Sequence, residues 1–202
     1  MPSTAQRRTT RVLLAAALVA IPRVASAHSQ IQGMSEFWSG VVHPFYTPAH
    51  VLLLVGLGLY MGQQVPRQIA VSVAAFSVAS AFALAATTMA TATAVAQPVL
   101  LTAAMCTAIA IVVERPLPTI ACALLYAVSA ILLGLDSSVE QAAPGPRAEM
   151  LLGTWLCMCF VVFELALVTF PLKRTWQRVG IRVAGSWILA ISMLVIAFAL
   201  KR

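Results

Sequence analysis

The strongest constraint in this sequence is a repeated alternation of long apolar stretches, each near the length of a bilayer crossing, with short polar breaks. A helix needs about 17–25 mostly apolar residues to cross the hydrocarbon core of a membrane. Only a helix or a closed barrel satisfies its own backbone hydrogen bonds there. The chain therefore predicts an all-α fold, a polytopic membrane bundle of six transmembrane helices. The predicted spans are approximately 37–62, 68–93, 99–113, 118–135, 150–171 and 179–200.

Composition agrees with a membrane protein and excludes several functional classes. Of the 202 residues, 61% are hydrophobic and 9% are charged, against a charged share of roughly 25% in soluble domains. The formal net charge of +7 does not indicate nucleic-acid binding, because the basic residues lie at the ends of apolar segments. Phosphate-binding glycine loops and hydrolase or zinc-protease motifs are missing from the sequence. The protein is therefore not expected to be an enzyme.

The first 27 residues, 1–27, have the pattern of a secretory signal peptide. A basic segment precedes an apolar run at 12–21, and the small-x-small sequence Ala25-Ser26-Ala27 follows. An apolar run of about 10 residues is too short for a stable crossing, which favours cleavage and makes His28 the new amino terminus. The alternative is an uncleaved anchor, which would add a seventh crossing. The α-amine and imidazole of His28 would form a chelating pair, unless this is an incidental terminal histidine.

The basic residues predict the orientation of the bundle. With an exported amino terminus, the breaks at 63–67, 114–117 and 172–178 face the cytoplasm, and most basic residues of the mature chain lie in or beside them. Short cytoplasmic loops carry an excess of Lys and Arg. The pattern predicts a multi-pass protein of a bacterial cytoplasmic membrane, with both mature termini on the exported side.

Two histidines in the first predicted span are candidates for chemistry. His43 and His50 are seven residues apart, about 10.5 Å along the axis of an unbroken helix. Pro44 and Pro48 disfavour a helix before them, so 43–48 is predicted to be a broken or re-entrant segment before a helix that begins near Pro48. The break would bring both imidazoles toward one point, where they suit nickel, copper, zinc or iron. The alternative is two interfacial histidines bonded to backbone carbonyls.

One carboxyl group is predicted to lie in the middle of a span. Glu164 has no basic residue within one helical turn, and a charge inside a bilayer costs about 2.5–3.5 kcal/mol on insertion scales. The Glu164 carboxyl group is therefore expected to be protonated, or to be paired with a group on another helix or with a cation. Cys157 and Cys159 would point about 200° apart on a helix and are not expected to chelate together. No disulfide framework is indicated.

A continuous segment around the two histidines carries a family resemblance. It reads His43-Pro44-Phe45-Tyr46-Thr47-Pro48-Ala49-His50, followed by an aliphatic run that contains Val55-Gly56-Leu57. It resembles the first-helix signature of the HupE/UreJ family of nickel/cobalt permeases, in which His-Pro is followed by an Asp-His pair and then an aliphatic run with Val-Gly-Leu. The signal pattern, the six spans and the Trp/Arg-containing loop before the last helix extend the resemblance over the mature chain. The resemblance implies inward transport of a divalent transition metal.

Two departures fall on the metal motifs of that family. The Asp expected before the second histidine is Ala49 here. A later family motif resembles His-Gly-x-Ala-His-Gly-x-Glu, and the best register, 133–140, keeps Gly134 and Glu140 but replaces both histidines. Other carboxylates would then have to compensate. The matched positions are His43, His50 and Glu140, and the carboxylates expected to compensate are Asp136 and Glu164.

Two hypotheses of different classes follow. The first is a permease that imports nickel or cobalt, with copper also compatible. The second is a divergent membrane scaffold, or an accessory or metal-delivery subunit, that does not transport. No tightly bound cofactor is expected. The expected partners are the lipid bilayer and the metal ion. The sequence is also compatible with a homo-oligomer or with a partner membrane subunit. The candidate metal-site residues are His28, His43, His50, Asp136, Glu140 and Glu164.

Overall fold

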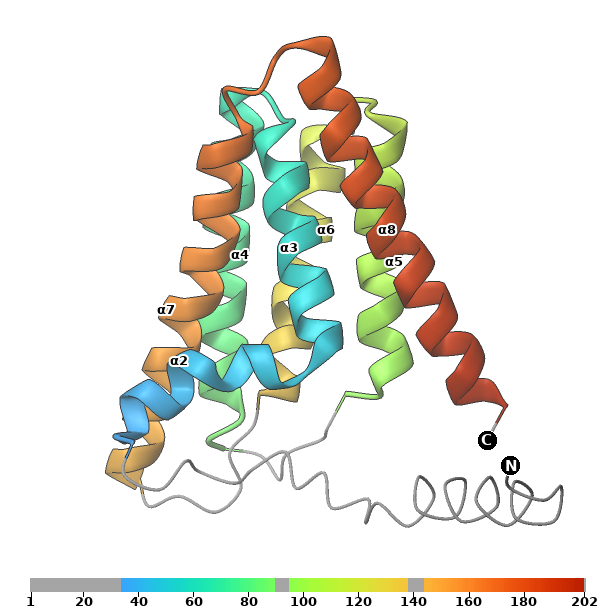
Figure 1. Ribbon diagram of the computed structural model, residues 1–202. Helices are drawn as coiled ribbons and strands as arrows, with labels where there is room; N and C mark the ends of the chain where they lie inside the picture. Colours follow the sequence, from blue (N-terminus) through green and yellow to red (C-terminus); the bar gives the residue numbers. More distant parts are fainter. Residues whose placement is uncertain (1–33, 90–94, 138–143, 202) are drawn as a thin grey trace, which may run out of the picture.

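The computed structural model describes residues 34–89, 95–137 and 144–201, and this part of the chain is helical throughout apart from short connections. Six helices, α3 to α8, run alternately up and down as a bundle, while α2 lies across one end of it (Figure 1). The predicted all-α fold is confirmed for the described residues, and the predicted signal peptide lies outside them. The helices are α2 (Glu36–Tyr46), α3 (Pro48–Gly62), α4 (Pro66–Ala86), α5 (Gln97–Val113), α6 (Thr119–Asp136), α7 (Pro144–Thr169) and α8 (Thr175–Leu200).

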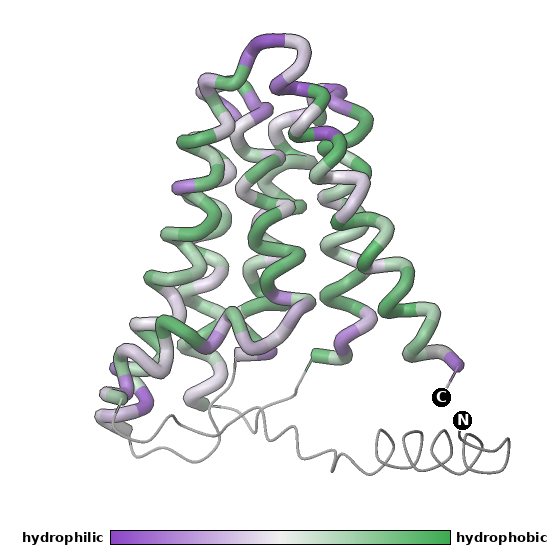
Figure 2. Tube along the Cα trace, viewed as in Figure 1, coloured by the Kyte–Doolittle hydropathy of each residue, from purple (hydrophilic) through white to green (hydrophobic). Residues whose placement is uncertain are grey.

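Length and hydropathy identify the helices that suit a membrane. Helices α4, α6, α7 and α8 are long and apolar enough to cross one, and the bent pair α2–α3 passes the same test only as a unit. Helix α5 has 17 residues and α3 has 15, or about 25 and 22 Å at 1.5 Å per residue, against a hydrocarbon core of about 30 Å. Apolar residues cover the flanks, and hydrophilic residues gather toward the two ends (Figure 2). The chain is a multi-pass membrane protein.

The first predicted span is broken in the structure. Helices α2 and α3 meet at an angle of 85°, and Thr47 between them is extended, with φ −106° and ψ 112°. Pro48 explains the break, because its ring disfavours helical backbone at the preceding residue and it suits the first position of a new helix. The predicted start of a helix at Pro48 is confirmed. The predicted break within the first span is present, but it is narrower than 43–48, since α2 continues through Pro44 to Tyr46.

Helix α2 is held across the bundle by two glycines. A Cβ atom added at Gly40 would lie 2.0 Å from the Met150 carbonyl oxygen, and one at Gly153 would lie 2.2 Å from the Phe37 carbonyl oxygen. The Thr154 hydroxyl also donates to the Gly40 carbonyl at 3.1 Å. The backbones of α2 and α7 therefore approach as closely as backbones can, and larger residues at these positions would push α2 away.

Helix α3 occupies the centre of the bundle and packs closely against α7. The spacing Gly58-x-x-x-Gly62, typical of helix contacts in membranes, lies on the α7 side. A Cβ atom at Gly58 would lie 2.6 Å from Cβ of Leu165, and one at Gly62 would lie 1.9 Å from Oγ1 of Thr169. These two glycines therefore let α3 and α7 approach closely.

Several helix ends differ from the predicted span ends. Helix α4 ends at Ala86 rather than at residue 93, because the hydroxyls of Thr87 and Thr88 bond back to the carbonyls of Leu84 and Ala85 at 2.6 and 2.7 Å and a turn follows. Residues 90–94 lie outside the described part. Helices α7 and α8 begin earlier than predicted, since hydropathy marks the apolar part of a helix and not its capped end.

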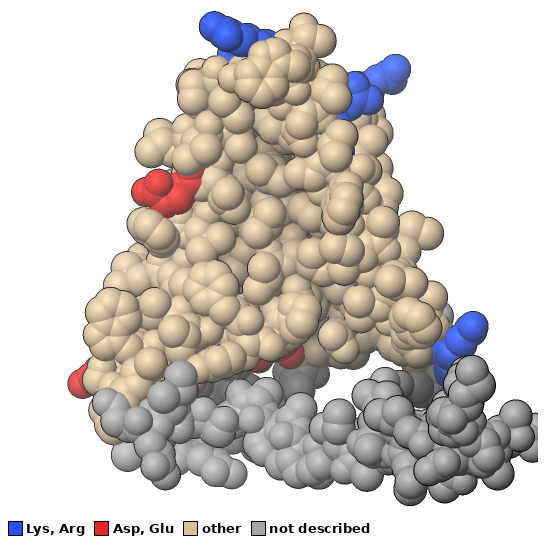
Figure 3. All heavy atoms as spheres, viewed as in Figure 1, with Lys and Arg blue, Asp and Glu red and all other residues tan. Residues whose placement is uncertain are grey.

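The two ends of the bundle differ in charge. Most Lys and Arg side chains gather where α3–α4, α5–α6 and α7–α8 are connected, and this is called the basic end (Figure 3). The opposite end, called the histidine end, holds α2, the start of α3 and the end of α6. The described basic-end residues are Arg67, Arg115, Lys173, Arg174, Arg178 and Arg182.

Candidate functional site

A buried contact between a histidine and a carboxylate lies at the histidine end. His50 is the third residue of α3 and is fully buried. Its Nε2 atom lies 2.8 Å from Oδ2 of Asp136, the last residue of α6. The two residues are 86 positions apart in sequence, so packing of α3 against the end of α6 creates the contact.

Asp136 is itself held in place by backbone. Its Oδ1 atom accepts a hydrogen bond from the backbone N–H of Val95 at 3.0 Å, and its side chain is 16% exposed. The two carboxylate oxygens therefore bond to different segments, α3 and the chain before α5. This arrangement fixes the carboxylate in position as an acceptor for His50.

The remaining ring nitrogen of His50 has no such partner. A carboxylate accepts hydrogen bonds, so the contact with Asp136 assigns the proton of a neutral imidazole to Nε2 and leaves a lone pair on Nδ1. The Nδ1 atom is buried, and among the described residues nothing bonds to it. A buried polar atom left unpaired costs about 1–3 kcal/mol, so this atom is the strongest sign of a ligand at this end.

His43 lies close to His50, as the broken helix predicts. It is a buried residue of α2, and its ring centroid lies 6.3 Å from that of His50, with 56° between the ring planes. Two imidazoles that share one tetrahedral ion through metal–nitrogen bonds of about 2.1 Å have ring centroids roughly 5.3 Å apart. The observed separation is longer than this, so the two rings must approach by about 1 Å to share an ion.

The described residues supply only part of a metal coordination shell. No group of three or more His, Cys, Asp or Glu side chains that could hold an ion occurs within residues 34–89, 95–137 and 144–201. The site consists of two imidazoles, with Asp136 engaged as a hydrogen-bond acceptor. Nitrogen donors of this kind suit nickel, cobalt, copper and zinc better than calcium or magnesium.

The other predicted site residues are not brought to this point. Glu164 is exposed on α7 and lies five residues before the helix ends at Thr169, which is about 7.5 Å along the axis. Glu164 therefore lies nearer the basic end than the histidine end, away from His43 and His50. His28 and Glu140 lie outside the described residues.

The described cysteines form no disulfides. All four are free thiols. Cys157 and Cys159 are both buried on α7, and the Cys159 thiol contacts the hydroxyl of Ser77 on α4 at 3.9 Å.

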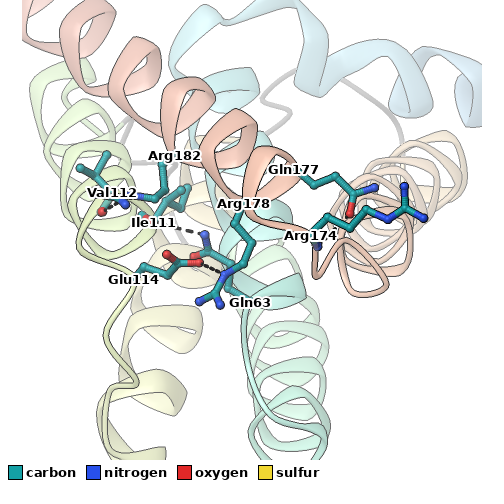
Figure 4. A network of polar contacts seen from close by, with 8 residues as sticks. All are labelled: Gln63, Ile111, Val112, Glu114, Arg174, Gln177, Arg178 and Arg182. Carbon is teal, nitrogen blue, oxygen red and sulfur yellow. Dashed lines mark hydrogen bonds and ion pairs between the residues drawn. The ribbon is translucent and has the colours of Figure 1, made fainter.

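The basic end carries a polar network that the sequence did not indicate. Arg178 of α8 bonds to Glu114 at 2.5 Å, and Arg182 donates to the Val112 carbonyl at 2.9 Å (Figure 4). Glu114 follows α5 with a left-handed backbone, φ 55°. A cavity of about 140 Å³ beside Glu114 and Arg178 is also lined by Gln63. The network joins α8 to the end of α5, and no sequence motif marks it, since its partners are more than sixty residues apart.

Comparison with known proteins identifies the family. The model of the family described as HupE / UreJ protein matches residues 16–195, which is most of the chain. The chain therefore belongs to this family. No curated protein and no solved structure matches it.

Proposed function

We propose that this member of the HupE/UreJ family is a permease that imports a divalent transition metal, nickel or cobalt, across the cytoplasmic membrane. His43 and His50 take the ion at the histidine end. The observation that carries the proposal is the His50 imidazole, whose Nε2 is fixed by Asp136 while its Nδ1 is buried without a partner among the described residues.

Asp136 acts as a positioning residue in this proposal. A histidine that binds a metal commonly donates its other ring N–H to a carboxylate, which fixes the tautomer and strengthens the ligand. Asp136 stands in that relation to His50. The family signature has a carboxylate directly before the second histidine, where this chain has the fully buried Ala49. Asp136 supplies a carboxylate to His50 from another helix instead.

Further ligands complete the shell in transit. His28 and Glu140 remain the proposed additional ligands, since Glu140 matches the later family motif and follows Asp136 by four residues. Glu164 is left out of this group, because it is exposed on α7 toward the basic end.

The proposed orientation places the histidine end outside and the basic end in the cytoplasm. The gathering of Lys and Arg at one end supports it through the excess of positive charge in cytoplasmic loops. With six crossings, both mature termini are exported. Paired reporter fusions after Arg202 test this: a reporter active only outside the cytoplasm is expected to work, and activity of a cytoplasm-only reporter would overturn the six-crossing count.

The test of transport is uptake of radiolabelled nickel and cobalt by cells that express the protein and lack their own importers. We expect uptake by the parent and its loss in His50→Ala at equal membrane abundance, because a ligand is removed. Equal uptake by the two would contradict the permease mechanism. No uptake by the parent, together with a collapse of His50→Ala abundance, would favour the non-transporting scaffold.

A further inference from the structure

The cavity beside Glu114 and Arg178 at the basic end has an excess of positive charge. Its volume of about 140 Å³ is well above the roughly 10–15 Å³ that one water molecule needs. Lys173 and Arg178 line it together with the Glu114 carboxylate, to which the Nε atom of Arg178 is bonded. No acidic group within residues 34–89, 95–137 and 144–201 pairs with Lys173, whose Nζ atom lies 4.5 Å from the centre of the Phe170 ring. The charge of the lining therefore favours an anion.

The same cavity is lined by an amide group whose oxygen is not bonded. The Nε2 atom of Gln63 donates to the Ile111 carbonyl of α5 at 3.4 Å. A carbonyl oxygen only accepts hydrogen bonds, so this contact assigns the amide nitrogen to the α5 side and leaves Oε1 as the other end of the group. The Oε1 atom is buried and has no partner among the described residues. An amide oxygen does not bind an anion, but it accepts a hydrogen bond from a hydroxyl group.

The cavity lies at the level of the bundle where lipid head groups are expected. It is enclosed by the basic-end termini of α3, α5, α7 and α8, and Figure 4 shows Gln63, Glu114 and Arg178 together there. Trp176 in the first turn of α8 is 68% exposed, and tryptophans of membrane proteins are enriched at the boundary between hydrocarbon and head groups. The Arg178 side chain is 52% exposed, so a molecule in the surrounding leaflet can reach its guanidinium group.

We propose that this cavity binds a glycerol phosphate group, whose source is either phosphatidylglycerol in the adjoining leaflet or free glycerol phosphate. Lys173 and the terminal N–H groups of Arg178 bind the phosphate, since Arg178 keeps its Nε atom on Glu114. A glycerol hydroxyl donates to Oε1 of Gln63. The single negative charge of a phosphodiester balances the excess charge of the lining, and the hydroxyl satisfies the unpaired acceptor. Basic pockets between transmembrane helices bind anionic head groups in this way.

The first test compares head groups at constant acyl chains. Dioctanoyl phosphatidylglycerol is added to the purified full-length protein in detergent, and we expect a saturable rise in the thermal unfolding temperature, because a ligand that binds only the folded state stabilises it. Dioctanoyl phosphatidylmethanol has the same charge and no glycerol hydroxyl, so we expect about tenfold weaker binding, as for the loss of one hydrogen bond. Dioctanoyl phosphatidylcholine should give no saturable rise. Equal rises with phosphatidylglycerol and phosphatidylcholine overturn the site.

The second test assigns the preference to Gln63. We expect Gln63→Leu to weaken phosphatidylglycerol binding about tenfold and to leave phosphatidylmethanol binding unchanged, so that the two lipids become equal. A purely structural Gln63 would instead weaken both lipids alike, and that result overturns the role of its oxygen.

The third test separates this cavity from the general positive charge of the basic end. We expect Lys173→Gln to weaken both anionic lipids about tenfold, because it removes the unpaired charge from the lining. Arg67→Gln is the matched control, since Arg67 is an exposed basic-end residue outside the lining, and we expect affinities within about twofold of the parent. Equal losses in the two variants would indicate unspecific attraction and overturn the site.

Competition by free glycerol phosphate identifies the source of the ligand. Displacement of phosphatidylglycerol at comparable concentrations assigns the site to the soluble compound, whereas displacement only at far higher concentrations assigns it to the lipid. Both results support the site, and no displacement at any concentration overturns it. None of these measurements uses metal uptake, so their failure leaves the proposed permease in place.

Discussion

Each end of the bundle holds a hydrogen bond between a carboxylate and a nitrogen group of another helix, and the two contacts differ most in their burial. His50 and Asp136 lie 2.8 Å apart with side chains 1% and 16% exposed. Glu114 and Arg178 lie 2.5 Å apart with side chains 18% and 52% exposed. Exposed pairs contribute about 0–1 kcal/mol, whereas removal of one partner from a buried pair destabilises by about 3–5 kcal/mol. The shorter contact is therefore expected to be the weaker one.

The pairs also differ in what surrounds them. At the basic end, Arg178 is half-exposed, so water can replace Glu114 as its partner. At the histidine end, water is excluded from His50, and its second nitrogen already lacks a partner among the described residues. We interpret the exposed pair as a helix connection and the buried pair as a site that an ion completes.

The largest effect on stability is expected from Asp136→Ala. It leaves a buried imidazole without its acceptor and frees the backbone N–H of Val95, so we expect a loss of about 2–4 kcal/mol in stability. Loss of the positioning carboxylate should also lower metal uptake about 10–100-fold. Unfolding of the purified protein and uptake at equal membrane abundance measure the two effects.

Asp136→Asn is the control for this experiment. Its single amide oxygen can accept from His50 or from the backbone N–H of Val95 but not from both, so we expect abundance and uptake between those of the parent and of Asp136→Ala. If Asp136→Ala proved as mild as a change at Glu114, the distinction between the two ends would fail.

A smaller effect is expected from His43→Ala. His43 lies on α2, outside the main bundle, whereas His50 is fixed by Asp136 within the first turn of α3. A ligand held in place by its surroundings contributes more than one on a separate helix. We expect His43→Ala to lower uptake about tenfold and His50→Ala to abolish it. The reverse order in parallel uptake assays would move the main ligand to α2.

Local chemistry made part of the site predictable. Pro48 determines both the break after α2 and the start of α3, because a proline acts on its immediate neighbours. The proximity of His43 and His50 follows from that break. The departures from the family's metal motifs also indicated Asp136 as a compensating carboxylate.

Long-range packing made the rest unpredictable. The role of Asp136 depends on a contact across 86 residues, and the path of α2 depends on close packing of Gly40 and Gly153 between separate helices. The distance of Glu164 from the histidine end depends on where α7 begins and ends, which the apolar stretch alone does not determine.

The smallest effect is expected at Glu114, where charge and backbone act in opposite directions. Glu114→Gln removes the ion pair with Arg178 and keeps the left-handed backbone at φ 55°, so stability should fall by at most about 1 kcal/mol. Glu114→Gly removes the same pair but adopts this backbone without the penalty of roughly 1–2 kcal/mol that a side chain incurs there. We therefore expect Glu114→Gly to be at least as stable as Glu114→Gln.

Uptake should stay within about twofold of the parent for both variants, since neither change alters a buried partner of the kind that costs several kcal/mol. Thermal unfolding in detergent measures the order, and a Gly variant clearly less stable than the Gln variant would show that the side chain of Glu114 contributes more than its ion pair.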